Sequence, residues 1–236
     1  MTINFASDRD IAHDVGEGPL IVGYFTPNYR DLAMALADNG VAVGMNVHLY
    51  AVHLSGDWHN ATHAQPKIMQ KAATDHAGRK LICMDVDCQI RRDFDIQLHG
   101  DIAFPLRVKV DKKRGKQYTF PSTRIIVFRA GNARVSRLLE TWCAELGRTD
   151  LPSSLVGGNE PSLMRALASS ELAMQPLDML HSAYEVDEAS PDAVIVHQSA
   201  HDQARPAVLR KKRLKAIKRA IIGLLIGRDY KSWKYG

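Results

Sequence analysis

The sequence has few cysteines and lacks the segments that mark secreted or membrane-spanning proteins. Three of its 236 residues are cysteines, so one must stay unpaired, and none has C-x-x-C spacing. The N-terminus has no basic stretch followed by an apolar core, which a secretion signal requires. No run of about 18 apolar residues is present to span a bilayer. These absences favour a reduced, cytoplasmic setting.

Several catalytic and metal-binding motifs are also missing. The chain has no G-x-x-x-x-G-K-[ST] loop and no G-x-S-x-G elbow, which excludes P-loop nucleotide hydrolysis and the common serine hydrolase arrangement. His59 and His63 are four residues apart, but they lack an H-E-x-x-H pattern and a nearby third ligand. A zinc site is therefore not expected there.

Positive charge is concentrated at the C-terminal end. Residues 206–236 contain ten lysines and arginines against one acidic residue, Asp229, which gives this segment a charge of +9. The whole chain carries +5, so residues 1–205 carry −4. A nucleic-acid enzyme is expected to have basic residues over its folded body. The mildly acidic body therefore argues against nucleic acid as a partner.

The first half of the chain alternates apolar strands with helices. Strands are expected at 20–26, 46–52 and 80–84. A first helix is expected over 29–39, with Asn28 as its N-cap and Gly40 at its C-terminal end. A second helix is expected to carry Pro66 in its first turn and to end at Gly78. A chain of 236 residues that is 45% hydrophobic can bury the core of one α/β domain. This order predicts an α/β fold with a mostly parallel sheet flanked by helices.

The second half is less regular. Strands are expected at 102–110 and 123–129, with a hairpin-like excursion between them, and a helix is expected over 132–146. A tight loop at 157–161 opens another helix that runs through Leu167. A short apolar strand at 194–196 ends in His197.

The triplet Asp85-Val86-Asp87 follows the apolar run 81–84 directly. Residues i and i+2 of an extended segment lie on one side, so both carboxylates can face one ion. Mg²⁺ and Mn²⁺ prefer oxygen ligands and often share substrate phosphates. Open α/β sheets bind ligands beyond the carboxyl ends of their strands. The triplet therefore predicts a divalent-metal site.

Five segments in order resemble the GT-A glycosyltransferases, the nucleotide-diphospho-sugar transferases. They are IVGYFT (21–26), QPKIMQKAATDHAGRKLICMDVDCQI (65–90), STRIIVFRAGNARVSRLLETW (122–142), GGNEPSL (157–163) and VIVH (194–197). The resemblance covers roughly residues 19–206, and its specificity comes from the order and spacing of short motifs. The chain departs from the family pattern at Asn159-Glu160, where an acidic-Gln pair is common, and at Arg205-Pro206, where Lys-Pro usually follows the late His more closely.

The resemblance implies a transfer reaction that depends on Mn²⁺ or Mg²⁺. Asp85 and Asp87 would bind the ion, His197 would complete its ligand shell, and Asp87 would also belong to the catalytic machinery. Lys67, in the first turn of a helix, would approach the nucleotide. Arg205 could meet the diphosphate through its guanidinium fork.

Other candidate site residues lie at element ends. Tyr24 and Thr26 lie at or after the end of the first strand, where a base and ribose would bind. Glu160, near a helix N-terminus, could act as general base on an acceptor hydroxyl, with Asn159 as its hydrogen-bonding neighbour. Two of these residues also have an ordinary structural interpretation: Tyr24 as core, and Glu160 as a first-turn cap.

Two alternative functions remain open. An apolar strand followed by D-x-D also resembles haloacid-dehalogenase-type phosphatases, with Asp85 as nucleophile and Asp87 as acid and base. Against this, Cys88-Gln89 occupies positions where that family has Thr or Val and Gly, and no later paired-Asp motif follows an apolar strand. A module that binds a nucleotide sugar without turnover is the other alternative.

The chain is expected to divide into a catalytic domain, residues 1–205, and a basic tail, residues 206–236. Within 209–235 apolar residues recur at three- and four-residue spacing among lysines and arginines, and aromatic residues follow. This pattern is typical of an amphipathic helix at an anionic membrane surface. A surface helix packed on the catalytic domain is the alternative. Membrane docking would place the protein at the inner face of the membrane and allow a lipid-linked acceptor.

Overall fold

The computed structural model describes residues 3–14, 16–54, 63–111, 115–148, 159–178, 181, 183–184 and 192–197. The tail 206–236 and Arg205 lie outside the described residues, and so does the loop 157–158. In the part that is described, no helix is long and apolar enough to cross a membrane.

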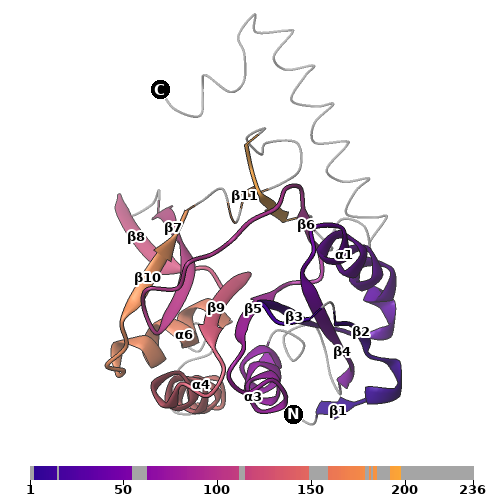
Figure 1. Cartoon of the computed structure of the whole chain (residues 1–236). Coiled ribbons are helices and arrows are strands. Elements are labelled where there is room, and N and C mark those ends of the chain that lie inside the picture. The colour runs from indigo at the N-terminus through magenta and orange to yellow at the C-terminus, as the bar shows by residue number, and fades with distance from the viewer. Residues whose placement is uncertain are drawn as a thin grey trace, which may run out of the picture. The chain divides into compact units, whose positions relative to one another are not determined.

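A large mixed sheet forms the centre of the fold (Figure 1). Its strands follow the order β1-β4-β3-β5-β9-β7-β10, with β2 paired to β4 and β8 paired to β7. Their bounds are β1 Ile3–Phe5, β2 Ile11–His13, β3 Leu20–Phe25, β4 Asn46–Leu54, β5 Lys80–Met84, β7 Ile102–Asp111, β8 Lys116–Pro121, β9 Ile125–Arg129 and β10 Met174–Leu177. Strands β4, β3 and β5 run parallel, as β7 and β10 do, and β9 is antiparallel to both of its neighbours.

A second, three-stranded sheet lies near the end of β5. It has the order β11-β12-β6, with β6 at Cys88–Ile90, β11 at Ala183–Tyr184 and β12 at Ile195–His197. Strand β6 begins four residues after β5 ends, so the chain passes from one sheet into the other through Asp85 and Asp87. The candidate metal ligands thus lie at the junction of the two sheets.

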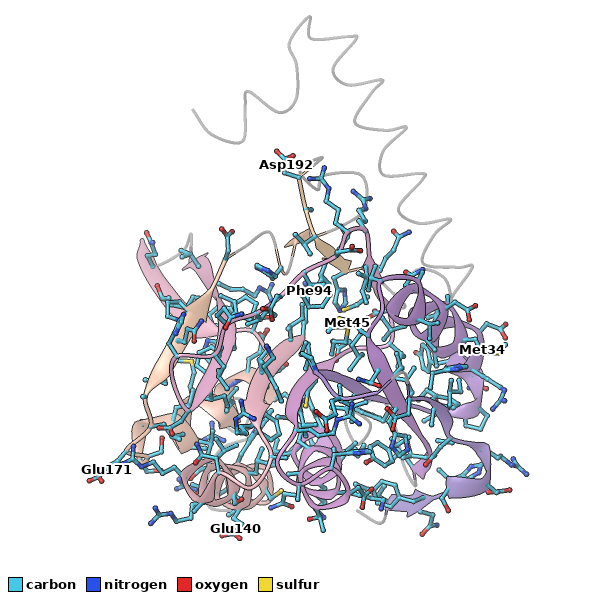
Figure 2. All side chains as sticks on the ribbon, in the orientation of Figure 1. Met34, Met45, Phe94, Glu140, Glu171 and Asp192 are labelled. Atoms are coloured by element: carbon cyan, nitrogen blue, oxygen red, sulfur yellow. The ribbon has the colours of Figure 1, made fainter. Side chains whose placement is uncertain are left out.

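Helices cover both faces of the central sheet, because its parallel strands are apolar on both sides. The helices are α1 Arg30–Ala42, α3 Gln65–Asp75, α4 Ala133–Leu146 and α6 Asn159–Ala168. Leu81 and Cys83 of β5 face a core shared with α3, α4 and α6, while Ile82 and Met84 face a core shared with α1 and the small sheet. Met45 belongs to the second of these cores and Phe94 packs against it; Figure 2 labels both side chains. The predicted α/β fold class is confirmed.

The predicted bounds of the first helix were wrong at both ends. Asn28 lies in a 3-10 turn, η2 Pro27–Tyr29, and the N-cap is Tyr29. Gly40 does not end the helix, which continues to Ala42; a Cβ at Gly40 would lie 2.6 Å from Val47 Cγ2, so this glycine allows α1 to pack closely on β4. The chain instead turns at Gly44, where φ is +70°.

Other boundaries agree well with the sequence prediction. The strand at 80–84 has the predicted bounds. The hairpin between 102 and 129 forms as β7 and β8, and Asn132 caps α4 by accepting hydrogen bonds from the backbone of Arg134 and Val135. The short strands β1, β2, β6, β10 and β11 were not predicted, because each has only two to four residues and is defined by its partner strand.

Candidate metal and nucleotide site

Asp85 and Asp87 occupy the turn that leaves β5. The backbone N–H of Asp85 donates to Arg124 O at 3.1 Å, which continues the β5–β9 ladder by one residue. Residues 86–87 then turn, and the N–H of Cys88 donates to Asp85 O at 3.0 Å. The two carboxylates are therefore brought together by a hydrogen-bonded turn, and not by alternation along an extended strand as the sequence argument assumed.

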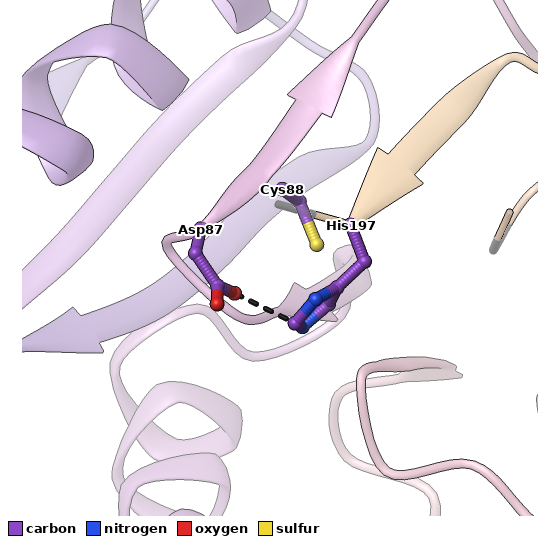
Figure 3. Close-up of side chains that lie close together, drawn as sticks. All are labelled: Asp87, Cys88 and His197. Atoms are coloured by element: carbon purple, nitrogen blue, oxygen red, sulfur yellow. Dashed lines mark ion pairs between the residues drawn. The ribbon is translucent and has the colours of Figure 1, made fainter. Parts of the chain in front are cut away.

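His197 reaches this turn through strand pairing. In the antiparallel pair β6–β12, His197 lies directly opposite Cys88. The His197 Nε2 atom lies 3.3 Å from Asp85 Oδ2. It also lies 3.0 Å from Asp87 Oδ1, the ion pair that Figure 3 draws. The structure thus brings together all three residues that the sequence analysis proposed as metal ligands, although His197 is 112 residues from Asp85.

The charges in this cluster depend on one another. Burial alone lowers the pKa of His197, but hydrogen bonds and charge interactions with Asp85 and Asp87 outweigh it and raise that pKa to about 9. Burial raises the pKa of Asp85, and the charge of Asp87 raises it further, while the hydrogen bond from His197 acts in the opposite direction. A divalent cation would supply positive charge to the same two carboxylates.

Cys88 is a further member of the cluster that the sequence analysis missed. Ligand atoms of Asp87, Cys88 and His197 all lie within 4.8 Å of one another. Cys88 is buried, and its pKa is well above the ordinary value because of burial first and the charges of Asp85 and Asp87 second. Its position directly after Asp87 was visible in the sequence, but its direction depends on the pairing of β6 with β12.

Tyr24 and Gln65 line a small cavity together with Asp85, at the ends of β3 and β5. The remaining lining is mostly apolar and comes from both strands and from α3: Val22, Gly23, Ile68, Met69, Ala72, Cys83 and Met84. Burial raises the pKa of Tyr24, and the charge of Asp85 raises it further, so the Tyr24 hydroxyl stays neutral at physiological pH. Tyr24 therefore lies at the same edge of the sheet as Asp85. Gln65 was not predicted.

Asn159 is connected to this cavity through Gln65. Its Nδ2 donates to Gln65 Oε1 at 2.7 Å, and Gln65 Nε2 in turn donates to the backbone carbonyl of Thr123. Ser162 Oγ donates to the carbonyl of Asn159 at 2.9 Å and accepts from the indole N–H of Trp142 at 2.9 Å. This network joins the N-terminus of α6 to α3, to α4 and to the segment just before β9.

Glu160, the other predicted residue of α6, forms an ion pair. Its Oε1 accepts a hydrogen bond from Arg107 Nη1 at 2.8 Å, and the Arg107 guanidinium lies 5.5 Å from the ring centre of Phe120, opposite it in the β7–β8 hairpin. The Glu160 carboxylate is thus half-buried and held in one orientation. Arg107 was not found by sequence reasoning, since nothing local pairs β7 with α6.

Thr26 and Lys67 occupy less informative positions. Thr26 is half-buried directly after β3, and its carbonyl accepts from the N–H of Tyr29. Lys67 is exposed in the first turn of α3, and its positive charge acts on the thiol of Cys143 in α4. Lys67 does not line the Tyr24 cavity.

No family model matches the sequence, and no curated protein matches it either. Solved structures do match the fold. A glycosyltransferase involved in glycosylation of the major capsid of PBCV-1 has a TM-score of 0.57 and 12% identity, over 80% of this chain and 97% of that one. An active-site mutant of LgtC gives a TM-score of 0.52 and 11% identity, over 77% of this chain and 87% of that one.

A third solved structure is the galactosyltransferase LgtC in complex with donor and acceptor sugar analogues. Its TM-score is 0.51 at 10% identity, again over 77% of this chain and 87% of that one. At such low identity these similarities describe the architecture. The chain has the fold of the GT-A glycosyltransferases.

Proposed function

We propose that this protein is a metal-dependent glycosyltransferase, which moves a sugar from a nucleotide-diphosphate donor to a hydroxyl acceptor in glycan or glycolipid assembly. The observation that carries the proposal is the convergence of Asp85, Asp87 and His197 where β5 leaves a sheet of the GT-A type. Fold alone does not define an activity. Two carboxylates and an imidazole at the carboxyl end of a parallel strand supply the site-level support.

The three residues fit a divalent cation. Asp85, Asp87 and His197 would hold Mn²⁺ or Mg²⁺ in place of the ion pairs that they form with one another. The ion would neutralise the charge that develops on the nucleoside diphosphate as the sugar bond breaks.

Two groups of residues would bind the donor around that ion. Tyr24 lines the cavity beside Asp85 and can donate a hydrogen bond from its neutral hydroxyl, and Thr26 follows at the same edge of the sheet. Lys67 and Arg205 are proposed to contribute positive charge toward the nucleotide and the diphosphate. Of these four, Tyr24 has the strongest structural support.

Residues of α6 would face the acceptor. Glu160 is proposed to take the proton from the attacking hydroxyl as general base, because its carboxylate is held in place by Arg107 and lies at a helix N-terminus. Asn159 would hold the neighbouring position through Gln65. In this proposal Arg107 is a positioning residue that orients Glu160.

A panel of UDP-, GDP- and CDP-sugars tests the proposal. Each donor is mixed with the full-length protein with and without Mn²⁺, and both the melting temperature and the release of the nucleoside diphosphate are measured. We expect at least one donor to raise the melting temperature and to be slowly hydrolysed. Both effects should require Mn²⁺. Turnover of simple phosphate esters would favour the phosphatase alternative. Stabilisation without any release would favour a non-catalytic binding module.

We propose that the tail 206–236 brings this activity to the inner face of an anionic membrane. Its charge of +9 contrasts with the −4 of residues 1–205, and each basic residue near an anionic surface contributes about 1 kcal/mol. The acceptor would then be lipid-linked.

A further inference from the structure

Cys88 lies beside Asp87 and His197, two of the residues proposed above to hold Mn²⁺ or Mg²⁺, and adds a sulfur atom to their possible ligand atoms. Directly opposed residues of an antiparallel pair have their side chains on one face of the sheet, so the Cys88 thiol and the His197 imidazole point the same way. Asp87, the residue before Cys88, reaches the same space from the turn. Figure 3 shows these three side chains converging.

The atoms have the spacing that a borderline-soft ion needs. Around a tetrahedral Zn²⁺, with bonds of about 2.0 to 2.3 Å, neighbouring ligand atoms are about 3.4 Å apart. His197 Nε2 and Asp87 Oδ1 are already 3.0 Å apart. The Cys88 sulfur, one ring nitrogen of His197 and one carboxylate oxygen of Asp87 all lie within 4.8 Å of one another, so a rotation of side chains, without a change of strand register, closes the site.

The surroundings favour a closed, preorganised site. Cys88 is 5% exposed, and the side chains of Asp87 and His197 are each 12% exposed, so few water molecules compete for the ion. The backbones that carry Cys88 and His197 are fixed to each other by the β6–β12 pairing. The other two cysteines are placed differently: Cys83 faces the core under α3, and Cys143 lies in α4.

We infer that Cys88 is a metal ligand, and that Asp87, Cys88 and His197 bind Zn²⁺ or Co²⁺ in competition with the Mg²⁺ or Mn²⁺ of the proposed function. A thiolate is a poor ligand for Mg²⁺ but a good one for Zn²⁺ and Co²⁺. The Cys88 sulfur would therefore raise the affinity for Zn²⁺ and Co²⁺ without contributing to the binding of Mg²⁺ or Mn²⁺. This inference rests on the proposed function in two respects: the location of the metal site, and the Mg²⁺ or Mn²⁺ with which Zn²⁺ would compete. Binding in the thiolate form releases the thiol proton to solvent.

Cobalt titration of the full-length protein tests this directly. A thiolate–Co²⁺ charge-transfer band in the near ultraviolet reports the sulfur ligand and requires no substrate. We expect the wild type to show this band at one equivalent of Co²⁺ and to lose it on addition of Zn²⁺. Cys88→Ser should lose the band and bind Co²⁺ and Zn²⁺ at least tenfold more weakly, while its Mn²⁺ affinity, read by electron paramagnetic resonance of free Mn²⁺, stays within about threefold.

Cys143→Ser is the matched control, because it removes a thiol of the same chain outside the cluster. It should keep the band. Cys88→Ala provides a second variant if Cys88→Ser melts early, and circular dichroism melting in chelator checks the fold of each. A band that persists in both Cys88 variants, or a wild type that binds Co²⁺ without the band, overturns the inference.

The proposed function and the inference about Cys88 can be disproved independently of each other. If Mn²⁺ binds through the carboxylates and donors turn over, but no thiolate band forms, the inference about Cys88 is wrong and the glycosyltransferase proposal stands. If the band forms and is lost in Cys88→Ser, but no nucleotide sugar binds or reacts with Mn²⁺, the metal inference stands and the glycosyltransferase proposal is wrong.

Discussion

Arg107 donates a hydrogen bond to Glu160 over 2.8 Å and thereby joins strand β7 to the first turn of α6. Both side chains are about one quarter exposed, and Phe120 lies beside the guanidinium. A partly buried ion pair of this kind fixes the direction of a carboxylate, whereas an exposed pair fixes little. The relationship makes Glu160 the best-oriented acceptor-side group of the proposed mechanism.

Glu160→Gln should lower sugar transfer by between about 100-fold and 10,000-fold, because the amide cannot accept the proton that a general base takes. Binding of the donor, measured by melting-temperature shift, should change little. The matched control is Glu145→Gln. Glu145 forms a comparable ion pair with Arg165 at the other end of α6, so its loss costs stability but should leave transfer near the wild-type rate. Equal transfer rates in the two variants would refute the assignment of Glu160.

Asp87→Asn should reduce donor turnover by on the order of a hundredfold or more, because it removes one charge from the ligand shell of an ion that stabilises the leaving diphosphate. Asp85→Asn should act in the same direction. Turnover is measured as release of the nucleoside diphosphate at saturating Mn²⁺. Asp95→Asn, which changes an exposed carboxylate paired with Lys80, is the control and should stay near wild type. Undiminished turnover in both site variants would contradict the metal site.

His197→Ala should weaken Mn²⁺ binding and should also destabilise the metal-free protein in a pH-dependent way. The folded-state pKa of His197, about 9, lies above its ordinary value of 6.5. A raised pKa means that the stabilisation is fully present below pH 6.5 and is lost as the pH rises through 9. The melting temperatures of wild type and His197→Ala, taken in chelator, should therefore differ most below pH 6.5 and converge above pH 9.

His76→Ala is the control for that pH series. Burial, followed by the charge of His48, lowers the pKa of His76, so its effect on stability has the opposite sign. The difference between wild type and His76→Ala should grow in favour of the wild type as the pH rises. A His197 series that follows the same trend as His76 would show that the carboxylates do not hold a protonated imidazole.

Replacing Lys211, Lys212 and Arg213 with glutamine should weaken binding of the full-length protein to anionic vesicles. Three charges at about 1 kcal/mol each predict that the affinity for anionic vesicles falls by about 100-fold. The difference should be smaller at high salt, because screening already weakens binding of the wild type. The matched control changes the same three residue types at Lys112, Lys113 and Arg114. Sedimentation with neutral and anionic vesicles measures the binding. Equal pelleting of both triple variants would exclude tail-mediated docking.

Local pattern was sufficient for much of this fold. The strand 80–84 and the D-x-D triplet after it could be predicted because an apolar run and its polar end are adjacent in sequence. The helix expected over 132–146, observed as α4 Ala133–Leu146, has the same local character. Gly40 was misread as a helix end, because close packing on Val47 requires the same residue type as a helix terminus.

Pairing over long distances accounts for what could not be predicted. Cys88 joins the candidate site through the register of β6 with β12, and Arg107 reaches Glu160 across 53 positions. Gln65 becomes polar lining of a cavity because α3 packs on β3 and β5. No neighbour in sequence signals any of these contacts. The position of His197 was anticipated by family resemblance, since a single histidine after a short strand is otherwise uninformative.

The separation in sequence between Asp85 and His197 also sets an order of events during synthesis. The 112 residues that separate Asp85 from His197 take roughly 6 to 22 s to translate at about 5 to 20 residues per second. During that interval the nascent chain contains both carboxylates but not the imidazole that pairs with them. Completion of the site therefore waits for β12, and the ability to bind metal through all three residues is acquired late in the biogenesis of the chain.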